Sequence, residues 1–342
     1  MSLVPPHDKT TDPFGIRAAT AQVMRETPWV TIDQNAIHRV AKSMHADRAA
    51  PPAWDDTLHF LGAPLETAGW VVVLDALNYC FWAQGDDPDI RWRVTWRGTT
   101  HNGYDALAAA LHRAVVDDGY PVWEADWLRD VSLDTVGHML RGDEGSPPIP
   151  LLRDRMVCLR DLGTSRYQRN KQPADIAVDA RGSAEHIVRL AKRRYLMYDD
   201  ISVWRCWDGQ AIWVPFFKRA QILAADLGGA LAGTDLAITK HQERLTAFAD
   251  YKVPQVLRQL GVLHYHPDLA GPIHRLQRIR VNSAEDVSIR SATVQACDRL
   301  AVALADLGVT TSASELDWRL WTLGQRLDHD AEPYHRTVSM RY

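Results

Sequence analysis

Apolar residues recur every three to four positions along most of this chain, which is the spacing of one face of an α-helix. Val253, Leu257 and Leu260, for example, follow one another in this way. The pattern predicts helices over 16–23, 32–44, 103–116, 131–140, 183–197, 218–232, 253–263, 293–307 and 314–327. Ser314 and Asp317 have the spacing of a capping-box variant at the start of the last of these helices. The chain is therefore expected to be mainly α-helical.

A second and shorter pattern predicts a small amount of β-structure. Residues 201–207 and 210–216 are rich in β-branched and aromatic residues, and they flank Asp208-Gly209. An Asp-Gly pair between two such runs is a strong signal for a β-hairpin. Residues 90–96 alternate between apolar and polar and predict another strand. The expected fold class is mainly α with a small β-hairpin or sheet.

One apolar run contains polar residues whose role the pattern leaves open. It begins at Trp70 and continues to Trp82, with Asp75 and Asn78 inside it. Buried polar groups need partners, so these two either stabilise a loop or face a ligand. The longest uninterrupted apolar runs are much shorter than a membrane span.

The domain organisation is predicted as one compact domain spanning 1–342. The turn-rich segment 145–150, which contains three prolines, is the best internal boundary. If the domain has two lobes, we expect them at about 15–145 and 150–342, a division of ordinary domain size.

The charge balance argues against a partner that is a long nucleic acid. The 342 residues carry a net charge of −4 and a pI near 6.4, whereas proteins that bind a nucleic-acid backbone usually have a basic surplus. A small anionic ligand bound by a few local cations stays open. Thirteen tryptophans are many for this length; they can form the core, and they can also stack on a planar ring.

The cysteines and the common motifs exclude several classes of site. Cys80, Cys158, Cys206 and Cys297 are scattered, so neither a structural zinc site nor a disulfide framework is indicated. We expect no metal and no cofactor. The first 13 residues lack the apolar core of a signal peptide, and we expect a cytoplasmic protein. No phosphate-binding glycine loop or hydrolase motif is present.

The stretch Phe248–Gln255 places one acid next to a predicted helix start. Pro254 suits the first helical position, so Asp250 would lie near the positive end of the helix dipole, where a carboxylate stays ionised. Two interpretations follow from this spacing. Asp250 is either a helix cap or a catalytic carboxylate.

Four ordered blocks together resemble the queuosine salvage protein family, whose members are queuosine 5′-phosphate N-glycosylases. The blocks are LDALNYCFW at 74–82, FKRAQIL at 217–223, FADYKVPQ at 248–255 and PYHRT at 333–337. The resemblance implies a helical core similar to that of the helix-hairpin-helix DNA glycosylases. It also implies a hydrolase that cleaves the N-glycosidic bond of queuosine 5′-monophosphate and releases queuine for salvage into tRNA modification.

The resemblance assigns roles to particular residues. It implies that Asp250 is the catalytic acid and that Phe248 lies beside the base. Ala249 and Tyr251 are further candidates for substrate binding, since Tyr251 could stack on the planar base. The resemblance further implies that a second group lines the ligand site: His59, Asp317 and Trp318. Asp317 is either a partner for the amine of the queuine side chain or a helix cap.

The 5′-phosphate of such a substrate would need donors. The cations in the matching blocks are the candidates, with Lys218 and Arg336 first: Lys218, Arg219, Lys252, His335 and Arg336. Each could equally form a surface ion pair.

The chemistry agrees with this assignment, and two alternatives stay open. Breaking a ribosyl bond builds positive charge on the sugar, which a fixed carboxylate stabilises or attacks. The base of queuosine, a 7-deazaguanine, lacks the N7 lone pair, so the carboxylate on the sugar side matters more. The alternatives are a DNA or RNA base glycosylase and a non-catalytic protein that binds a modified nucleoside. The oligomeric state is not predicted.

Overall fold

The structure is a computed structural model, and it describes residues 5–47, 54–82, 90–164, 171–327 and 331–342. Helices account for about 52% of the chain, which confirms the predicted mainly α class. Strands in the described ranges form two-stranded antiparallel sheets, β1 with β6, β2 with β3, and β4 with β5. None of the helices in these ranges combines the length and apolarity of a membrane span.

The chain divides into two compact units, and each contains segments that are distant in sequence. The first unit comprises Met1–Pro52, Asp200–Lys218 and His241–Val338. Its helices and strands, in chain order, are α1 (Ile16–Glu26), β1 (Val30–Ile32), α2 (Gln34–Asp47), β4 (Ile201–Arg205), β5 (Ala211–Pro215), η2 (Gln242–Arg244), α11 (Lys252–Gln259), β6 (Leu263–Tyr265), α12 (Pro267–His274), α13 (Ala284–Ala305) and α14 (Ala313–Gln325).

The second unit comprises Ala53–Asp199, Arg219–Lys240 and Ser339–Tyr342. Its elements are α3 (Pro64–Ala76), β2 (Arg93–Trp96), β3 (Thr99–Asn102), α4 (Gly103–Val116), α5 (Ala125–Asp130), α6 (Leu133–Met139), α7 (Leu152–Thr164), α8 (Asp175–Asp179), α9 (Ala184–Arg194) and η1 (Leu196–Tyr198). Helix α10 (Lys218–Ala230) begins with a residue of the first unit. The predicted single glycosylase-like domain and its boundary at 145–150 stay predictions.

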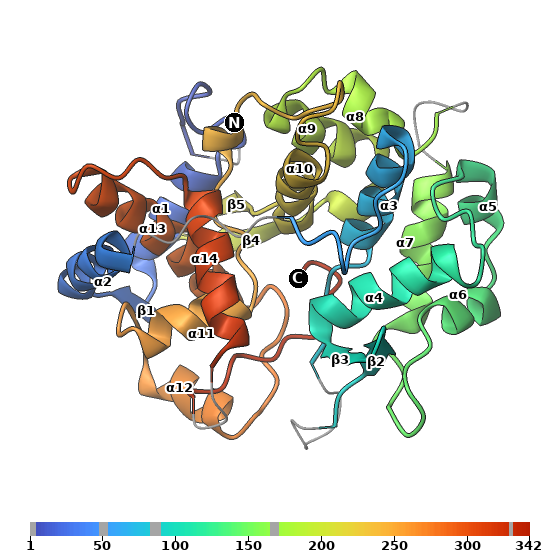
Figure 1. Ribbon diagram of the computed structural model, residues 1–342. Coiled ribbons are helices and arrows are strands. Elements are labelled where there is room, and N and C mark those ends of the chain that lie inside the picture. Colours follow the sequence, from blue (N-terminus) through green and yellow to red (C-terminus); the bar gives the residue numbers. More distant parts are fainter. Residues whose placement is uncertain (1–4, 48–53, 83–89, 165–170, 328–330) are drawn as a thin grey trace. The chain divides into compact units, whose positions relative to one another are not determined.

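Helix α13 is the central helix of the first unit. It packs against α1, α2, α11 and α14, which surround it in Figure 1. Its second half places Leu300 and Leu304 in the apolar core. Its first half is polar and still buried, with Ser288, Arg290 and Thr293 fully inaccessible. A buried helix with polar residues has no apolar stripe, which is why the predicted start at 293 was wrong and the helix begins at 284.

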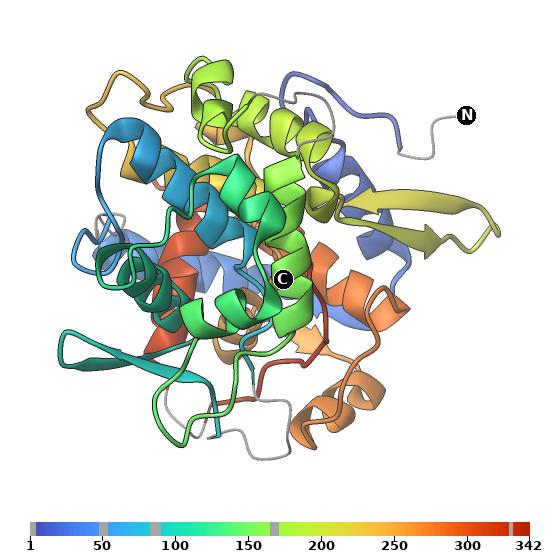
Figure 2. The same ribbon diagram turned by 90° about the vertical axis from the view of Figure 1, so that its right-hand side faces the viewer.

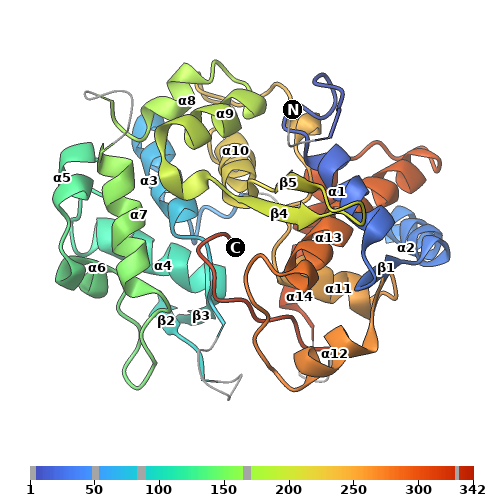
Figure 3. The same cartoon turned by 180° about the vertical axis from the view of Figure 1, so that it is seen from behind.

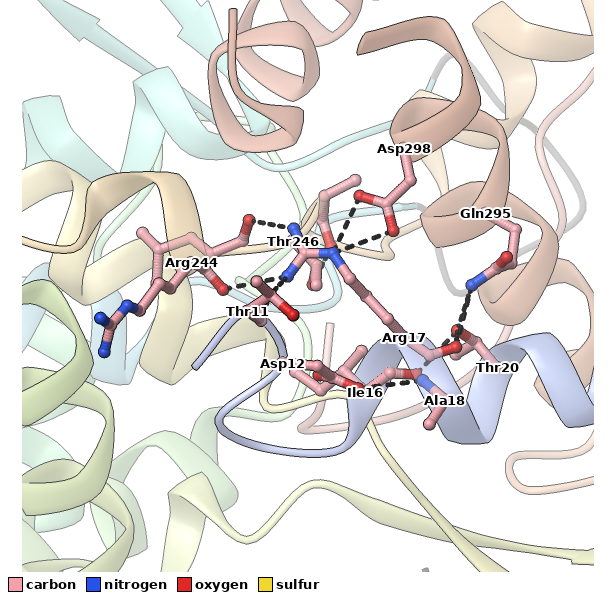
Figure 4. A network of polar contacts seen from close by, with 12 residues as sticks. Thr11, Asp12, Ile16, Arg17, Ala18, Thr20, Arg244, Thr246, Gln295 and Asp298 are labelled. Carbon is pink, nitrogen blue, oxygen red and sulfur yellow. Dashed lines mark hydrogen bonds and ion pairs between the residues drawn. The ribbon is translucent and has the colours of Figure 1, made fainter. Parts of the chain in front are cut away.

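Arg17 connects α1 to α13 and to the segment that leads into the candidate site (Figure 4). Its guanidinium donates to Asp298 at 3.1 and 3.2 Å. It also donates to the carbonyl oxygens of Arg244 at 3.3 Å and of Leu245 at 3.0 Å. Residues 245–250, which follow η2, have no regular secondary structure, and side-chain donors of this kind satisfy the backbone there.

The β4–β5 hairpin confirms the prediction from Asp208-Gly209. The strands pair with Val203 opposite Trp213, and Figure 2 shows them side by side in yellow. Gly209 has φ +80°, a left-handed conformation that glycine adopts without a steric cost.

In the second unit, α3 accounts for the apolar run that begins at Trp70. This helix is buried on all sides from Thr67 to Ala76, and residues 70–74 are fully inaccessible. It packs against α4, α7 and α8, and Figure 3 shows α7 beside α5 and α6. A Cβ at Gly69 would lie 2.3 Å from the Cβ of Trp123, so only glycine allows this close approach. Asp75 and Asn78 are both buried.

The capping box of α14 lies two residues earlier than the predicted one. The Ser312 hydroxyl accepts the N–H of Glu315 at 3.1 Å, and Glu315 accepts the N–H of Ser312 at 2.8 Å. The predicted pair, Ser314 and Asp317, was wrong because both residues lie inside the helix. Asp317 is therefore available for a bond outside its own helix.

Replacing Ser312 by Ala should lower the free energy of unfolding by about 1 kcal/mol, since one helix N–H loses its acceptor. Urea or thermal unfolding measures the change. Ser312→Asp is the matched control, because a carboxylate can accept the same bond, and it should unfold like the wild type. An equal loss in both variants would contradict this assignment of the cap.

Candidate active site

Asp250 is the last residue of an irregular segment, and its carboxylate accepts hydrogen bonds from the first N–H groups of α11. Its Oδ1 accepts from Lys252 at 2.8 Å and from Val253 at 3.0 Å. The structure therefore confirms the capping role, and a capping carboxylate can still act in catalysis. The prediction that Pro254 is the first helical residue was wrong, because α11 begins two residues earlier. The third position also has no helical acceptor for its N–H, so proline is tolerated there.

Asp317 lies on α14 and contacts the same segment. Its Oδ1 accepts the N–H of Phe248 at 2.8 Å. Phe248 and Ala249 are almost fully buried, and so are both carboxyl groups. The sequence-predicted residues Phe248, Ala249, Asp250 and Asp317 are thus brought together in one buried cluster, with Tyr251 as the N-cap of α11.

Burial and mutual repulsion govern the protonation of this carboxyl pair. Burial raises the pKa of Asp250 above its ordinary value, and the charge of Lys218 and the two helix N–H groups oppose that rise. Burial raises the pKa of Asp317 well above its ordinary value, and the charge of Asp250 raises it further. We assign the first negative charge to Asp250 because the N–H groups and Lys218 stabilise its carboxylate. Asp317 is then the carboxyl group whose pKa lies further above its ordinary value.

Lys218 is a cation whose charge acts on this site, and it is buried at the start of α10. The preceding residue, Phe217, has φ +48°, which is uncommon for a residue with a Cβ. A cation at a helix N-terminus opposes the dipole, so Lys218 needs a negative charge nearby, which an outside partner or an acid of the protein could supply. The effect of Lys218 on the pKa of both Asp250 and Asp317 favours the nearby acids.

Two aromatic residues that were predicted to contact the ligand, Tyr251 and Trp318, are neighbours in sequence of Asp250 and Asp317. Trp318 follows Asp317 on α14 and is half-buried. The ring of Tyr251 lies 4.9 Å from that of Tyr334, at 37° to it.

The phosphate candidates have different environments. Lys252 donates to the carbonyl oxygen of Gly324 at 3.1 Å. Arg336 is buried on the C-terminal segment, where its carbonyl oxygen accepts from the N–H of Ile279 at 2.8 Å. Burial, with the charges of nearby arginines, lowers the pKa of His335 to about 3, so this ring offers no charge at neutral pH.

Arg219 belongs to the second unit and has partners there. It donates to the carbonyl oxygens of Ala76 at 2.6 Å and of Met197 at 2.5 Å. Its guanidinium also lies over the ring of Tyr79, 4.9 Å from the centroid.

His59 also belongs to the second unit and is buried there. Its Nδ1 lies 2.7 Å from the carbonyl oxygen of Asp55, and its Nε2 lies 2.9 Å from the hydroxyl of Tyr104. The ring stacks on Trp54 at 4.2 Å. A carbonyl can only accept, so Nδ1 carries the proton in the neutral ring. Burial lowers the pKa of His59, which favours this neutral form.

Sequence reasoning missed two residues that contact the cluster, Asp200 and Arg290. The guanidinium of Arg290 donates to both carboxylate oxygens of Asp200, at 2.9 and 2.6 Å, and to the carbonyl oxygen of Ala249 at 3.2 Å. The sequence signal that could have identified Arg290 is its position as the one charged residue in the stretch 287–297. The apolar pattern used for helices does not register such a residue.

No group of three or more potential metal ligands was found among the residues that the structure describes.

Comparison with known proteins places the chain in a family. The sequence profile of a family described as "Queuosine salvage protein" matches residues 58–342. A relative from Sphaerobacter thermophilus, named queuosine 5′-phosphate N-glycosylase/hydrolase, is 38% identical over 97% of this chain and 98% of its own length. Relatives of the same name from Bos taurus and Dictyostelium discoideum are 30% and 28% identical, over 92% and 96% of this chain and 94% and 98% of their own lengths. The chain belongs to the queuosine salvage protein family, as its four sequence blocks predicted.

Because the pKa of His335 is lowered, this residue should make the protein sensitive to acid. Between pH about 6.5 and 3 the unfolded state takes up a proton at His335 that the folded state does not, so stability falls as the pH falls. From pH 7.5 to 5.5 this one group should cost about 1 kcal/mol. Unfolding of the wild type and of His335→Gln at both pH values measures it. An equal loss of stability in the two proteins would contradict the neutral, buried histidine.

Proposed function

We propose that this protein hydrolyses the N-glycosidic bond of queuosine 5′-monophosphate and releases queuine for salvage into tRNA modification. The observation that supports this most directly is the buried pair of Asp250 and Asp317, with Lys218 acting on both. The names of relatives that match the chain almost from end to end agree with an N-glycosyl hydrolase.

The catalytic group in this proposal is the carboxylate of Asp250. Cleavage leaves positive charge on the sugar carbon, water supplies the new C–O bond, and the base leaves with a proton. Asp250 either stabilises that positive charge or bonds to the carbon before water does. Both routes need an ionised carboxylate, and the N–H groups of Lys252 and Val253 with Lys218 favour that form against burial.

The other predicted site residues would bind the substrate. Phe248, Ala249, Tyr251 and Trp318 would contact the planar base, and stacking on aromatic rings is a general way to hold an unpaired base. Asp317 would contact the amine of the queuine side chain, which is a cation that a buried carboxyl can pair with.

His59, Lys218 and Arg336 complete the proposed set. Lys218 and Arg336 would bind the 5′-phosphate, whose binding energy positions the sugar. His59, with Nδ1 protonated, has Nε2 as its acceptor, and a donor group of the substrate would replace the Tyr104 hydroxyl that lies 2.9 Å from it.

The partner in this proposal is a small nucleotide, with no polymeric nucleic acid, no membrane and a cytoplasmic location. The net charge of −4 disfavours the alternative of a glycosylase acting on DNA or RNA. The alternative of a non-catalytic carrier is separated by turnover, because a carrier would return the nucleotide intact.

Asp250→Asn should fold and bind the nucleotide but lose turnover. The amide oxygen can still accept the two helix N–H groups, so only the charge is removed. We expect the rate of queuine release to fall by roughly 10²–10³ or more, the size of one lost electrostatic contact. Queuine release, nucleotide affinity and melting temperature are the three measurements.

Asp33→Asn is the matched control, because the Asp33 carboxylate accepts the N–H of Ala36 at the start of α2 at 2.9 Å. This variant should retain the wild-type rate. A wild-type rate in Asp250→Asn would end the catalytic assignment, and intact nucleotide after incubation with the wild type would favour the carrier.

A further inference from the structure

The buried ion pair of Arg290 and Asp200 has a geometry that suggests more than a contribution to stability. The Arg290 side chain is fully inaccessible, and that of Asp200 is 5% exposed. The two form a fork-to-fork contact, with nitrogen–oxygen distances of 2.9 and 2.6 Å. The guanidinium also lies over the ring of Phe216, at 3.9 Å from its centroid. Both position and plane of the guanidinium are therefore fixed.

Arg290 contacts the backbone directly before the proposed catalytic residue. Its Nε donates to the carbonyl oxygen of Ala249 at 3.2 Å. On the other side of Ala249, the N–H of Phe248 donates to Asp317. The backbone that leads into Asp250 is thus held at two points. Asp317 of α14 accepts one of its N–H groups, and Arg290 of α13 donates to one of its carbonyl oxygens.

Asp200 contacts the start of α10 in a corresponding way. Its Oδ2 accepts the N–H of Lys218 at 3.2 Å. Its backbone carbonyl accepts the N–H groups of Phe216 at 3.0 Å and of Phe217 at 3.3 Å. The left-handed conformation of Phe217 costs energy and persists only where surrounding contacts impose it. Asp200 supplies three such contacts, and they determine where Lys218 begins its helix.

A purely structural role explains this arrangement less well. Burying two charges gains little net stability, and replacing such a pair by apolar residues of similar size is often neutral or stabilising. Stability alone therefore does not explain why the ion pair is present. Arg290 contacts the backbone before Asp250, and Asp200 contacts the N–H of Lys218. Resting on the proposed function, we propose that Arg290, together with Asp200, is a positioning residue that sets the Asp250 carboxylate and the Lys218 ammonium in place for cleavage.

The double variant Asp200→Leu with Arg290→Met tests this, because it removes both charges and leaves neither unpaired. It should fold with a melting temperature close to that of the wild type. Its kcat should fall about 100-fold, as expected when a reacting group is displaced by about 1 Å, with KM changed by less than about threefold. The acid limb of its pH profile should move up by about one unit, since Lys218 is no longer held near Asp250.

Leu304→Ala is the matched control. It removes a buried side chain of the same helix, α13, 14 residues away and about 21 Å along the axis. This control should lose thermal stability and keep the kcat, KM and pH profile of the wild type. A double variant with wild-type kcat and pH profile would overturn the proposal.

Arg290→Lys is a second test of the positioning role, and it applies if the double variant does not fold. The lysine retains the charge but not the planar fork or the Nε bond, so kcat should fall at least about tenfold, and an unchanged kcat would overturn the proposal. Amide exchange at Lys252 and Val253 should also quicken by about tenfold or more in whichever variant folds. This readout separates the two claims, because a wild type without hydrolysis refutes the proposed function, whereas unchanged exchange refutes the positioning role.

Discussion

A charge buried without a partner is far more costly than a buried apolar group, and this constraint shapes the first unit around Arg290 and Asp200. The arginine lies in the polar half of α13, the helix against which α1, α2, α11 and α14 pack. Its bonds reach the start of β4 through Asp200 and the irregular segment before α11 through Ala249. Segments 40 to 90 residues apart in sequence are thereby fixed by one guanidinium.

The same exclusion of water acts on the carboxyl pair. Burial raises the pKa of both Asp250 and Asp317, so the unit must stabilise one negative charge by other means. Two helix N–H groups and Lys218 do this at Asp250. In a low dielectric these contacts are stronger than they would be in water, and a carboxylate held in this way is suited to stabilise positive charge on a sugar. In the proposed reaction, one carboxylate would therefore serve both capping and catalysis.

The sequence predicted what local patterns encode. Helix spacing predicted the mainly α class, Asp208-Gly209 predicted the hairpin, and Phe248–Gln255 indicated an acid at a helix start. It did not predict the start of α13, because a buried polar half has no apolar stripe. The sequence patterns also failed to predict the roles of Asp200 and Arg290. Their role depends on contacts between residues 90 positions apart, whereas helix and strand patterns compare only residues that are close in sequence.

The central claim is that the ionised carboxylate of Asp250 drives cleavage, and one titration tests it most directly. The carboxyl carbon of Asp250, labelled with ¹³C and assigned by its loss in Asp250→Asn, can be followed by NMR across the acid range. Its pKa should lie above the ordinary 3.8 and should match the acid limb of kcat/KM, which reports the free enzyme. A titration of Asp250 that leaves kcat/KM unchanged across its midpoint would contradict the account.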